Sequence, residues 1–210
     1  MTMRRLGEGE RHVRGGAWGG LRPTFMLGRT LRGKTLGIVG YGRIGRAVAR
    51  QAAAAFDMKI IYHAPREPRI DDPATAGPAG AERVDSLETL LARADVVSLH
   101  CPATPETRHL MNARTLALMP AHAYLVNTAR GDVVDEAALA SVLKERKIAG
   151  AGLDVYEFEP SVTAELMELE NVVLLPHLGS ATIETRTNMG MRALSNLDSF
   201  VQTGSVSDPV

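Results

Sequence analysis

Short apolar runs alternate along the chain with longer segments whose apolar residues recur every three or four positions. The short runs contain many β-branched residues and predict strands at Thr35–Val39, Met58–Tyr62, Arg83–Val84, Val96–His100, Tyr124–Asn127, Gly150–Val155 and Val172–Leu175. The longer segments predict helices at Arg43–Phe56, Ser86–Ala92, Asn112–Leu118, Glu136–Lys144 and Ile183–Thr203. Apolar strands separated by helices indicate an α/β fold, with a doubly wound parallel sheet of about seven strands and helices on both faces.

The same pattern divides the chain into three parts. Residues 1–34 are rich in glycine and arginine and show little periodicity, so we interpret them as an arm or linker. Its scattered apolar residues favour an arm that docks on something else: Trp18, Leu21, Phe25, Met26 and Leu27. Residues 35–182 form the sheet domain, and residues 183–210 hold a C-terminal amphipathic helix.

Composition limits the partners and the compartment that we expect. Lys plus Arg and Asp plus Glu number 24 each, which indicates neither a nucleic-acid nor a membrane partner. The single cysteine, Cys101, excludes an intrachain disulfide and favours a reducing, cytoplasmic compartment. We expect no transmembrane run, no signal peptide at residues 1–14 and no metal site.

A glycine signature follows the first predicted strand. Gly40, Gly42 and Gly45 match G-x-G-x-x-G between that strand and a helix. The first glycine permits a tight turn, the second lets the backbone approach a pyrophosphate, and the third lets helix and strand pack closely. The helix N-terminus then favours the negative charge of the phosphate. We therefore predict a dinucleotide site, the alternative being a glycine-rich turn without a ligand.

The end of the second predicted strand bears on the choice between NAD and NADP. An NAD site usually has a carboxylate there for the ribose 2′-hydroxyl, but Asp57 precedes the strand and the next acid is Glu67. The positive groups that follow the strand are His63, Arg66 and Arg69. They suit a 2′-phosphate, so we favour NADP over NAD; the alternative is that these arginines are only solvated loop residues.

Five segments occur in an order that resembles a known family. They are Leu36–Gly45, Asp95–Pro102, Val126–Gly131, Gly152–Glu157 and Leu175–Ser180. Together they resemble the D-isomer-specific 2-hydroxyacid dehydrogenases, which include glyoxylate/hydroxypyruvate reductases and D-glycerate dehydrogenases. The resemblance runs from about Gly15 to the C-terminus and implies that residues 35–182 are an NAD(P)-binding Rossmann domain.

The resemblance also implies roles for individual residues. Arg130 matches the arginine that holds the substrate carboxylate, His177 the general acid/base, and Glu159 the carboxylate paired with that histidine. Glu157 is the alternative to Glu159, although the residue before Pro160 fits the family pattern better. The implied cofactor contacts, besides the three glycines, His63 and Arg66, are Arg43, Ile44, Pro102, Thr107, Thr128, Ala129, Arg130, Asp154, His177, Gly179 and Ser180.

The chemistry of 2-oxo-acid reduction needs these residue types. A guanidinium suits the substrate carboxylate, an imidazole can donate a proton near neutral pH, and a carboxylate beside it favours the imidazolium form. Arg130, Glu159 and His177 each follow a predicted strand, at the edge where ligands bind in open α/β sheets. The alternatives are an arginine that caps carbonyls in a turn and an ordinary loop histidine.

Two functions follow from the resemblance. The first is an oxidoreductase that transfers hydride between NADP(H) or NAD(H) and a small 2-oxo or D-2-hydroxy acid such as glyoxylate or hydroxypyruvate. The second is a dinucleotide-binding dimerisation module, or an inactive fragment, without turnover. The resemblance implies that the N-terminal part of the substrate domain, on which the C-terminal helix would pack, is missing. We expect a homodimer formed through the Rossmann face and the arm at Gly15–Leu31.

Overall fold

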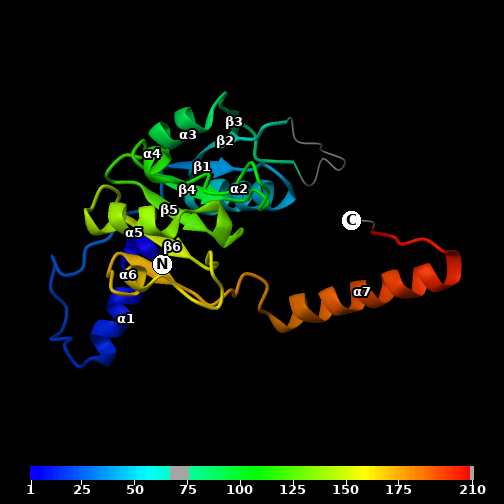
Figure 1. The fold of residues 1–210 in the computed structure, drawn as a ribbon. Helices are drawn as coiled ribbons and strands as arrows, with labels where there is room; N and C mark the ends of the chain where they lie inside the picture. The colour runs from blue at the N-terminus through cyan, green and yellow to red at the C-terminus, as the bar shows by residue number, and fades with distance from the viewer. Residues whose placement is uncertain (67–75, 209–210) are drawn as a thin grey trace. The chain divides into compact units, whose positions relative to one another are not determined.

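A single sheet of seven parallel strands lies at the centre of the computed structural model, which describes residues 1–66 and 76–208 (Figure 1). In chain order, its strands are β1 (Thr35–Val39), β2 (Lys59–His63), β3 (Glu82–Arg83), β4 (Val96–Leu99), β5 (Tyr124–Asn127), β6 (Gly150–Leu153) and β7 (Val172–Leu174). Their spatial order is β3-β2-β1-β4-β5-β6-β7, so the chain reverses direction across the sheet between β1 and β4. This arrangement confirms the predicted doubly wound parallel sheet.

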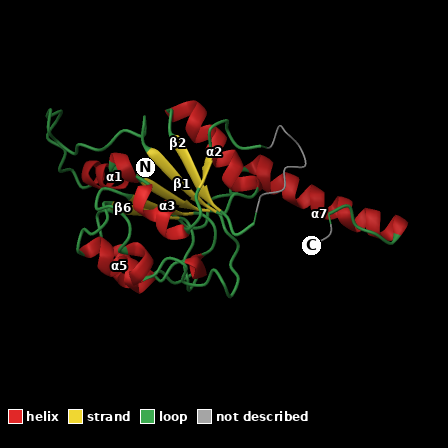
Figure 2. Cartoon of the chain, turned by 90° about the horizontal axis from the view of Figure 1, so that it is seen from above, coloured by secondary structure: helices red, strands yellow, loops and turns green. Residues whose placement is uncertain are grey.

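Helices cover both faces of this sheet. They are α2 (Arg43–Phe56), α3 (Leu87–Arg93), α4 (Ala113–Leu116), α5 (Glu136–Lys144) and α6 (Ala164–Met167). Figure 2 shows α2 and α5 on opposite sides of the strands. Alternation along β1 explains the two layers, because Leu36 and Ile38 pack with α2 residues whereas Val39 packs in the cluster that includes α3 and α5.

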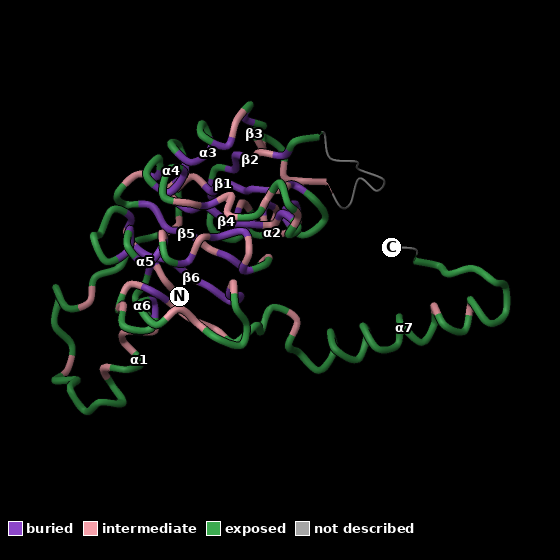
Figure 3. Tube along the Cα trace, in the orientation of Figure 1, coloured by how far each residue is buried: buried purple, intermediate pink, exposed green. Residues whose placement is uncertain are grey.

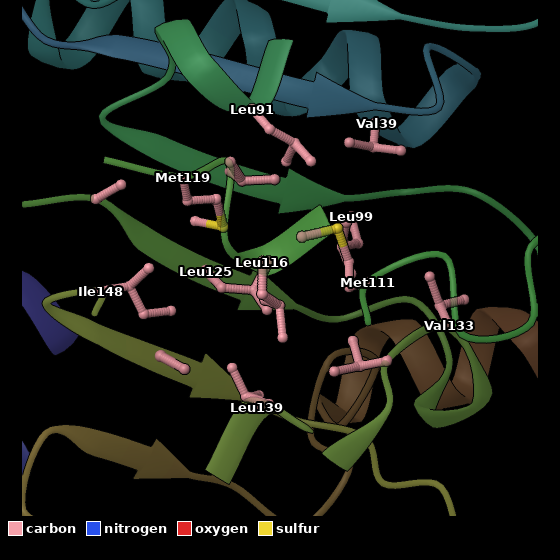
Figure 4. Packing of buried hydrophobic residues seen from close by; sticks show 14 of the residues in the cluster. Val39, Leu91, Leu99, Met111, Leu116, Met119, Leu125, Val133, Leu139 and Ile148 are labelled. Atoms are coloured by element: carbon pink, nitrogen blue, oxygen red, sulfur yellow. The ribbon is translucent and has the colours of Figure 1, made fainter. Parts of the chain in front are cut away.

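The larger of the two apolar clusters lies on the α3, α4 and α5 face. Figure 4 shows its packing, in which Leu99 and Leu125 from the strands meet Leu91, Leu116 and Leu139 from the helices. All five side chains are fully buried (0% exposed), so this cluster stabilises the platform from which the loops at the carboxyl ends of the strands project.

The N-terminal segment differs from the prediction of an irregular arm. A 3₁₀ turn, η1 (Thr2–Arg4), and a helix, α1 (Leu6–Arg14), precede the exposed stretch around Trp18. Met3 is buried in the cluster beside α2, and a Cβ placed on Gly152 of β6 would lie 2.9 Å from Thr2 Oγ1. The first residues therefore pack against β6, which lies between β5 and β7, and local periodicity does not reveal this tertiary contact.

Several boundaries also move by a few residues. Strand β2 includes His63, which the sequence placed in the following loop, while β4, β6 and β7 end one or two residues earlier than predicted. Helix α4 is shorter than the predicted Asn112–Leu118, and α6 was not predicted. Such short elements carry too little periodic pattern to be delimited from sequence.

The chain divides into two units, Met1–Leu175 and Pro176–Val210. The predicted boundary lay at residue 183, so the division comes earlier and places His177 in the second unit. Helix α7 (Ile183–Thr203) begins at its cap Thr182, whose hydroxyl accepts from Thr185 N, and ends at Gly204 with φ of 72°. The helix is coloured as exposed along most of its length in Figure 3, and its exposed apolar residues include Leu194, Leu197 and Phe200. No helix in the described part of the chain is long and apolar enough to cross a membrane.

Candidate functional site

The glycine loop lies between β1 and α2 at the switch point of the sheet. Gly40 has φ of +89°, and a Cβ on it would lie 2.7 Å from Cys101 N. A Cβ on Gly45 would lie 2.4 Å from Gly40 O, so this glycine lets α2 approach the loop. By contrast, a Cβ on Gly42 would meet no atom within 4 Å. The fold thus requires glycine at positions 40 and 45, whereas Gly42 borders open space.

The start of α2 has the features of an anion site. Gly42 is the N-cap of a 14-residue helix and makes no side-chain cap hydrogen bond. The first backbone N–H groups, at Arg43 and Ile44, therefore need an acceptor from outside the helix. Ile44 is 70% exposed beside them. The residues present fit the pyrophosphate of a dinucleotide, because they offer amide donors, the positive helix end and room above Gly42.

The carboxyl end of β2 adjoins this loop. Gly40 N donates a hydrogen bond to His63 O at 2.9 Å, and His63 Nδ1 lies 3.2 Å from Val84 O. Arg66 is exposed, whereas Glu67 and Arg69 lie outside the described residues. Sequence reasoning missed Arg83, whose Nη2 donates to Ala64 O at 3.2 Å and so brings another cation to this edge. The pairing of Tyr62 with Arg83 in the sheet places it there.

A cleft of about 490 Å³ opens beside His63. Its lining comes from the segments that follow β3 and β4 and includes Asp85, Ser86, Leu87, Glu106, Arg108, His109 and Asn112. In the segment after β4, Thr107 Oγ1 donates to Pro102 O at 2.6 Å and accepts from Thr104 N at 2.8 Å. The two predicted cofactor contacts, Pro102 and Thr107, are therefore tied together in one turn.

Arg130 stands on a turn at the end of β5. The buried Asn127 side chain organises the turn, since its amide donates to Arg130 O at 2.9 Å and its carbonyl accepts from Ala129 N at 3.0 Å. Arg130 is exposed, and its Nη1 donates to Ala129 O at 2.7 Å. This is the carbonyl-capping contact that the sequence allowed, but it uses one of five guanidinium N–H donors. Thr128 is also exposed.

The segment after β6 carries the other predicted carboxylates. Asp154 is buried (5% exposed), and its N–H donates to Asn127 O at 3.0 Å, which joins it to the Arg130 turn. Glu159 is exposed and its Oε1 accepts from Tyr156 N at 3.0 Å.

Glu157 has different surroundings from Glu159. Its carboxylate is nearly buried and contacts His109 Nε2 at 2.7 Å and Arg108 Nη2 at 3.1 Å. These contacts engage Glu157 in a local ion-pair cluster, so Glu159 is the better candidate for a substrate-site carboxylate.

The Arg130 turn and the Glu159 segment are in backbone contact. Gly131 begins the 3₁₀ turn η3 (Gly131–Val133), and a Cβ on it would lie 1.9 Å from Tyr156 C and 2.3 Å from Glu157 N. No side chain larger than hydrogen fits between the two segments. Sequence reasoning missed this role, because nothing local distinguishes Gly131 from other turn glycines.

His177, Gly179 and Ser180 lie near the start of the second unit, which begins at Pro176. His177 is exposed and has φ of 54°, a left-handed conformation that is uncommon for a non-glycine residue. In the first unit, Tyr156 Oη donates to Leu175 O at 2.8 Å, and burial raises the pKa of this phenol. The chain is thus anchored two residues before His177.

His100 and Cys101 follow β4. His100 Nε2 lies 2.9 Å from Ser98 Oγ, and burial lowers the pKa of His100 to about 4. Burial also raises the pKa of the Cys101 thiol. The fold therefore favours the neutral imidazole of His100 and the protonated thiol of Cys101.

Comparison with known proteins gives a family match for most of the chain. Residues 1–179 match the model of the D-isomer specific 2-hydroxyacid dehydrogenase, NAD binding domain. A glyoxylate reductase of Thermococcus litoralis is 49% identical over 203 residues, which cover 95% of this chain and 60% of that protein. The chain thus spans about 60% of the length of such curated relatives.

Solved structures of similar fold include reductases of the same kind. An NADPH-dependent glyoxylate/hydroxypyruvate reductase of Sinorhizobium meliloti, in complex with NADP and malonate, has a TM-score of 0.87 and 38% identity. The match covers 100% of this chain and 63% of that one. A glyoxylate reductase of Paecilomyes thermophila has a TM-score of 0.85 and 41% identity, with 98% and 60% covered.

Proposed function

Because this chain belongs to the D-isomer specific 2-hydroxyacid dehydrogenase family, we propose that it reduces small 2-oxo acids, such as glyoxylate and hydroxypyruvate, to D-2-hydroxy acids. The observation that supports this most directly is the contact between the Arg130 turn and the Glu159 segment at the edge of a sheet whose glycine loop fits a dinucleotide. Similarity to glyoxylate reductases adds support for the substrate class.

Three side chains divide the chemistry in this proposal. The Arg130 guanidinium pairs with the substrate carboxylate and polarises the adjacent carbonyl. In this proposal His177 is the general acid that donates a proton to the carbonyl oxygen, and Glu159 is the carboxylate assigned to pair with it. A bound reduced nicotinamide supplies the hydride for C2. Asp154 would hold the nicotinamide carboxamide, and the amides at the start of α2 would hold the pyrophosphate.

We further propose NADP(H) as the preferred cofactor. His63 and Arg66 stand at the carboxyl end of β2, where a 2′-phosphate would need positive partners. The adenosine end would then occupy the cleft beside His63. Titration of the chain with NADPH and with NADH, followed by nicotinamide fluorescence, tests this preference, and tighter binding of NADH would refute it.

The turnover assay tests the reaction itself. NADPH oxidation by the 210-residue chain is measured with glyoxylate and with hydroxypyruvate at high enzyme concentration. Consumption of NADPH that depends on either acid supports the oxidoreductase. Tight dinucleotide binding without any acid-dependent turnover would instead indicate the alternative, a binding module.

A homodimer through the Rossmann face and Gly15–Leu31 is also part of the proposal. Trp18 is 58% exposed and Leu21 94% exposed, which suits a surface that a second copy covers. Light scattering at micromolar concentration should give twice the mass of the chain, and Trp18→Ser should lower it. A monomeric wild-type chain would contradict this proposal.

A further inference from the structure

A buried carboxylate stands at the first residue of α5. Glu136 is 2% exposed, whereas the neighbouring Asp135 performs the usual capping task by accepting from Ala138 N. Burial of a carboxylate is costly unless hydrogen bonds satisfy it. Glu136 Oε1 accepts from Glu157 N at 2.7 Å, and Oε2 accepts from Thr163 Oγ1 at 2.5 Å and from Thr163 N at 3.4 Å. The carboxylate is therefore satisfied by partners outside its own helix.

These partners are the two ends of one loop. Glu157 begins and Thr163 ends the segment that carries Glu159. The Glu136 carboxylate therefore holds the two ends of this loop together through hydrogen bonds to both of its oxygens. The loop contacts the rest of the site through Tyr156. The N–H of Tyr156 donates to Glu159 Oε1, and its carbonyl carbon lies against Gly131. A shift at Glu157 N would thus move both the Glu159 carboxylate, which accepts from the neighbouring Tyr156 N, and the backbone contact of this loop with Gly131.

We propose that Glu136 is a positioning residue that holds the Glu159 carboxylate beside the Arg130 turn. This inference rests on the proposed function of Glu159. An apolar residue could fill the same space without a charge to bury. It could not accept from Glu157 N, however, and that buried N–H would be left without its partner. Directional hydrogen bonds fix the loop backbone, and a misplacement of about 1 Å can cost roughly 100-fold in rate.

Amide hydrogen exchange tests the positioning without reference to catalysis. Glu136→Gln keeps the size of the side chain but replaces one acceptor oxygen by a donor, and Thr163→Val removes one hydroxyl contact. Glu145→Gln, at the exposed C-terminal end of the same helix, is the matched control. Exchange at Tyr156 and Glu157 should rise roughly tenfold in the first two variants and stay unchanged in the control. Unchanged exchange in Glu136→Gln, or an equal rise throughout the sheet, would overturn the proposal.

Steady-state kinetics then separate positioning from a merely structural contact. Glu136→Gln should lower kcat for glyoxylate by roughly 100-fold while the KM for NADPH stays unchanged, as in Glu159→Gln. If Glu159→Gln lowers kcat and Glu136→Gln does not, the inference about Glu136 is wrong. If Glu159→Gln has wild-type kcat, or the wild-type chain has no turnover, the proposed function fails, and exchange at Tyr156 and Glu157 alone decides whether Glu136 holds the loop.

Discussion

Substitution of the signature glycines by alanine should separate the role of the glycine loop in the fold from its role in binding. A Cβ on Gly45 would lie 2.4 Å from Gly40 O and 3.1 Å from Ile38 Cγ2, so Gly45→Ala forces α2 away from β1. Overpacking of this kind costs about 1–3 kcal/mol. We expect Gly45→Ala to lower the free energy of unfolding by that amount and to weaken dinucleotide binding with it.

Gly42→Ala should weaken dinucleotide binding without lowering the free energy of unfolding. No atom lies within 4 Å of the added Cβ, and the backbone at φ −74° and ψ −166° accepts alanine. Stability should therefore be unchanged or rise by about 0.4–1 kcal/mol through the unfolded state. The methyl group would occupy the space over the first amides of α2, and loss of a charge-assisted hydrogen bond there costs about 1.5–3 kcal/mol in binding.

Urea unfolding and calorimetric titration with NADPH measure the two quantities on the same samples. Gly190→Ala is the control, because its Cβ would also meet nothing within 4 Å but it lies in α7. It should stabilise that helix by about 1 kcal/mol and leave NADPH affinity unchanged. Wild-type affinity in Gly42→Ala would refute the placement of the pyrophosphate over this loop.

Three further changes have defined outcomes. Arg66→Ala should weaken NADPH by about 1.5–3 kcal/mol in a fluorescence titration and leave NADH unaffected; an equal loss for both cofactors would argue against a 2′-phosphate contact. His177→Ala should lower kcat by about 100- to 10,000-fold at similar NADPH affinity, and an unchanged kcat would remove it from the mechanism. Because the pKa of His100 is lowered to about 4 in the fold, the unfolded state takes up its proton first as pH falls below 6.5, and stability decreases. His100→Gln should reduce that loss between pH 6.5 and 4 in urea titrations; an unchanged pH dependence would contradict the assignment.

Elements with strong local patterns were predictable from the sequence. The structure confirms the predicted bounds of Arg43–Phe56, Tyr124–Asn127, Glu136–Lys144 and Ile183–Thr203. In the helices, the periodic apolar positions lie within the segment itself and the capping residues directly flank it. Helix α1 was not predicted, because Leu6 and Val13 are exposed and its segment contains two glycines. Its anchor is the burial of Met3, a contact with residues far along the chain.

The candidate site was predictable only where one residue type identifies a chemical role. Arg130 and Glu159 could be proposed from their motifs, and the structure brings their backbone segments together. Gly131 and Glu136 could not be proposed from the sequence. Gly131 looks like any turn glycine, and Glu136 looks like an ordinary acidic residue in the first turn of a helix. Their roles depend on Tyr156 and Glu157, which reach them only through the tertiary fold.

Three of the buried polar residues of the first unit lie at the same edge of the sheet. Asn127, Glu136 and Asp154 are each no more than 5% exposed, and each flanks the Arg130 turn or the Glu159 segment. Polar groups of this kind add little stability compared with apolar residues of similar size, because desolvation offsets most of what their hydrogen bonds contribute. Their hydrogen bonds instead fix the direction of backbone groups, and a site that must hold a substrate carboxylate beside a proton donor needs that rigidity. The exposed side chains of Arg130 and Glu159 therefore stand on a rigid base, and we expect substitutions in that base to impair turnover more than cofactor binding.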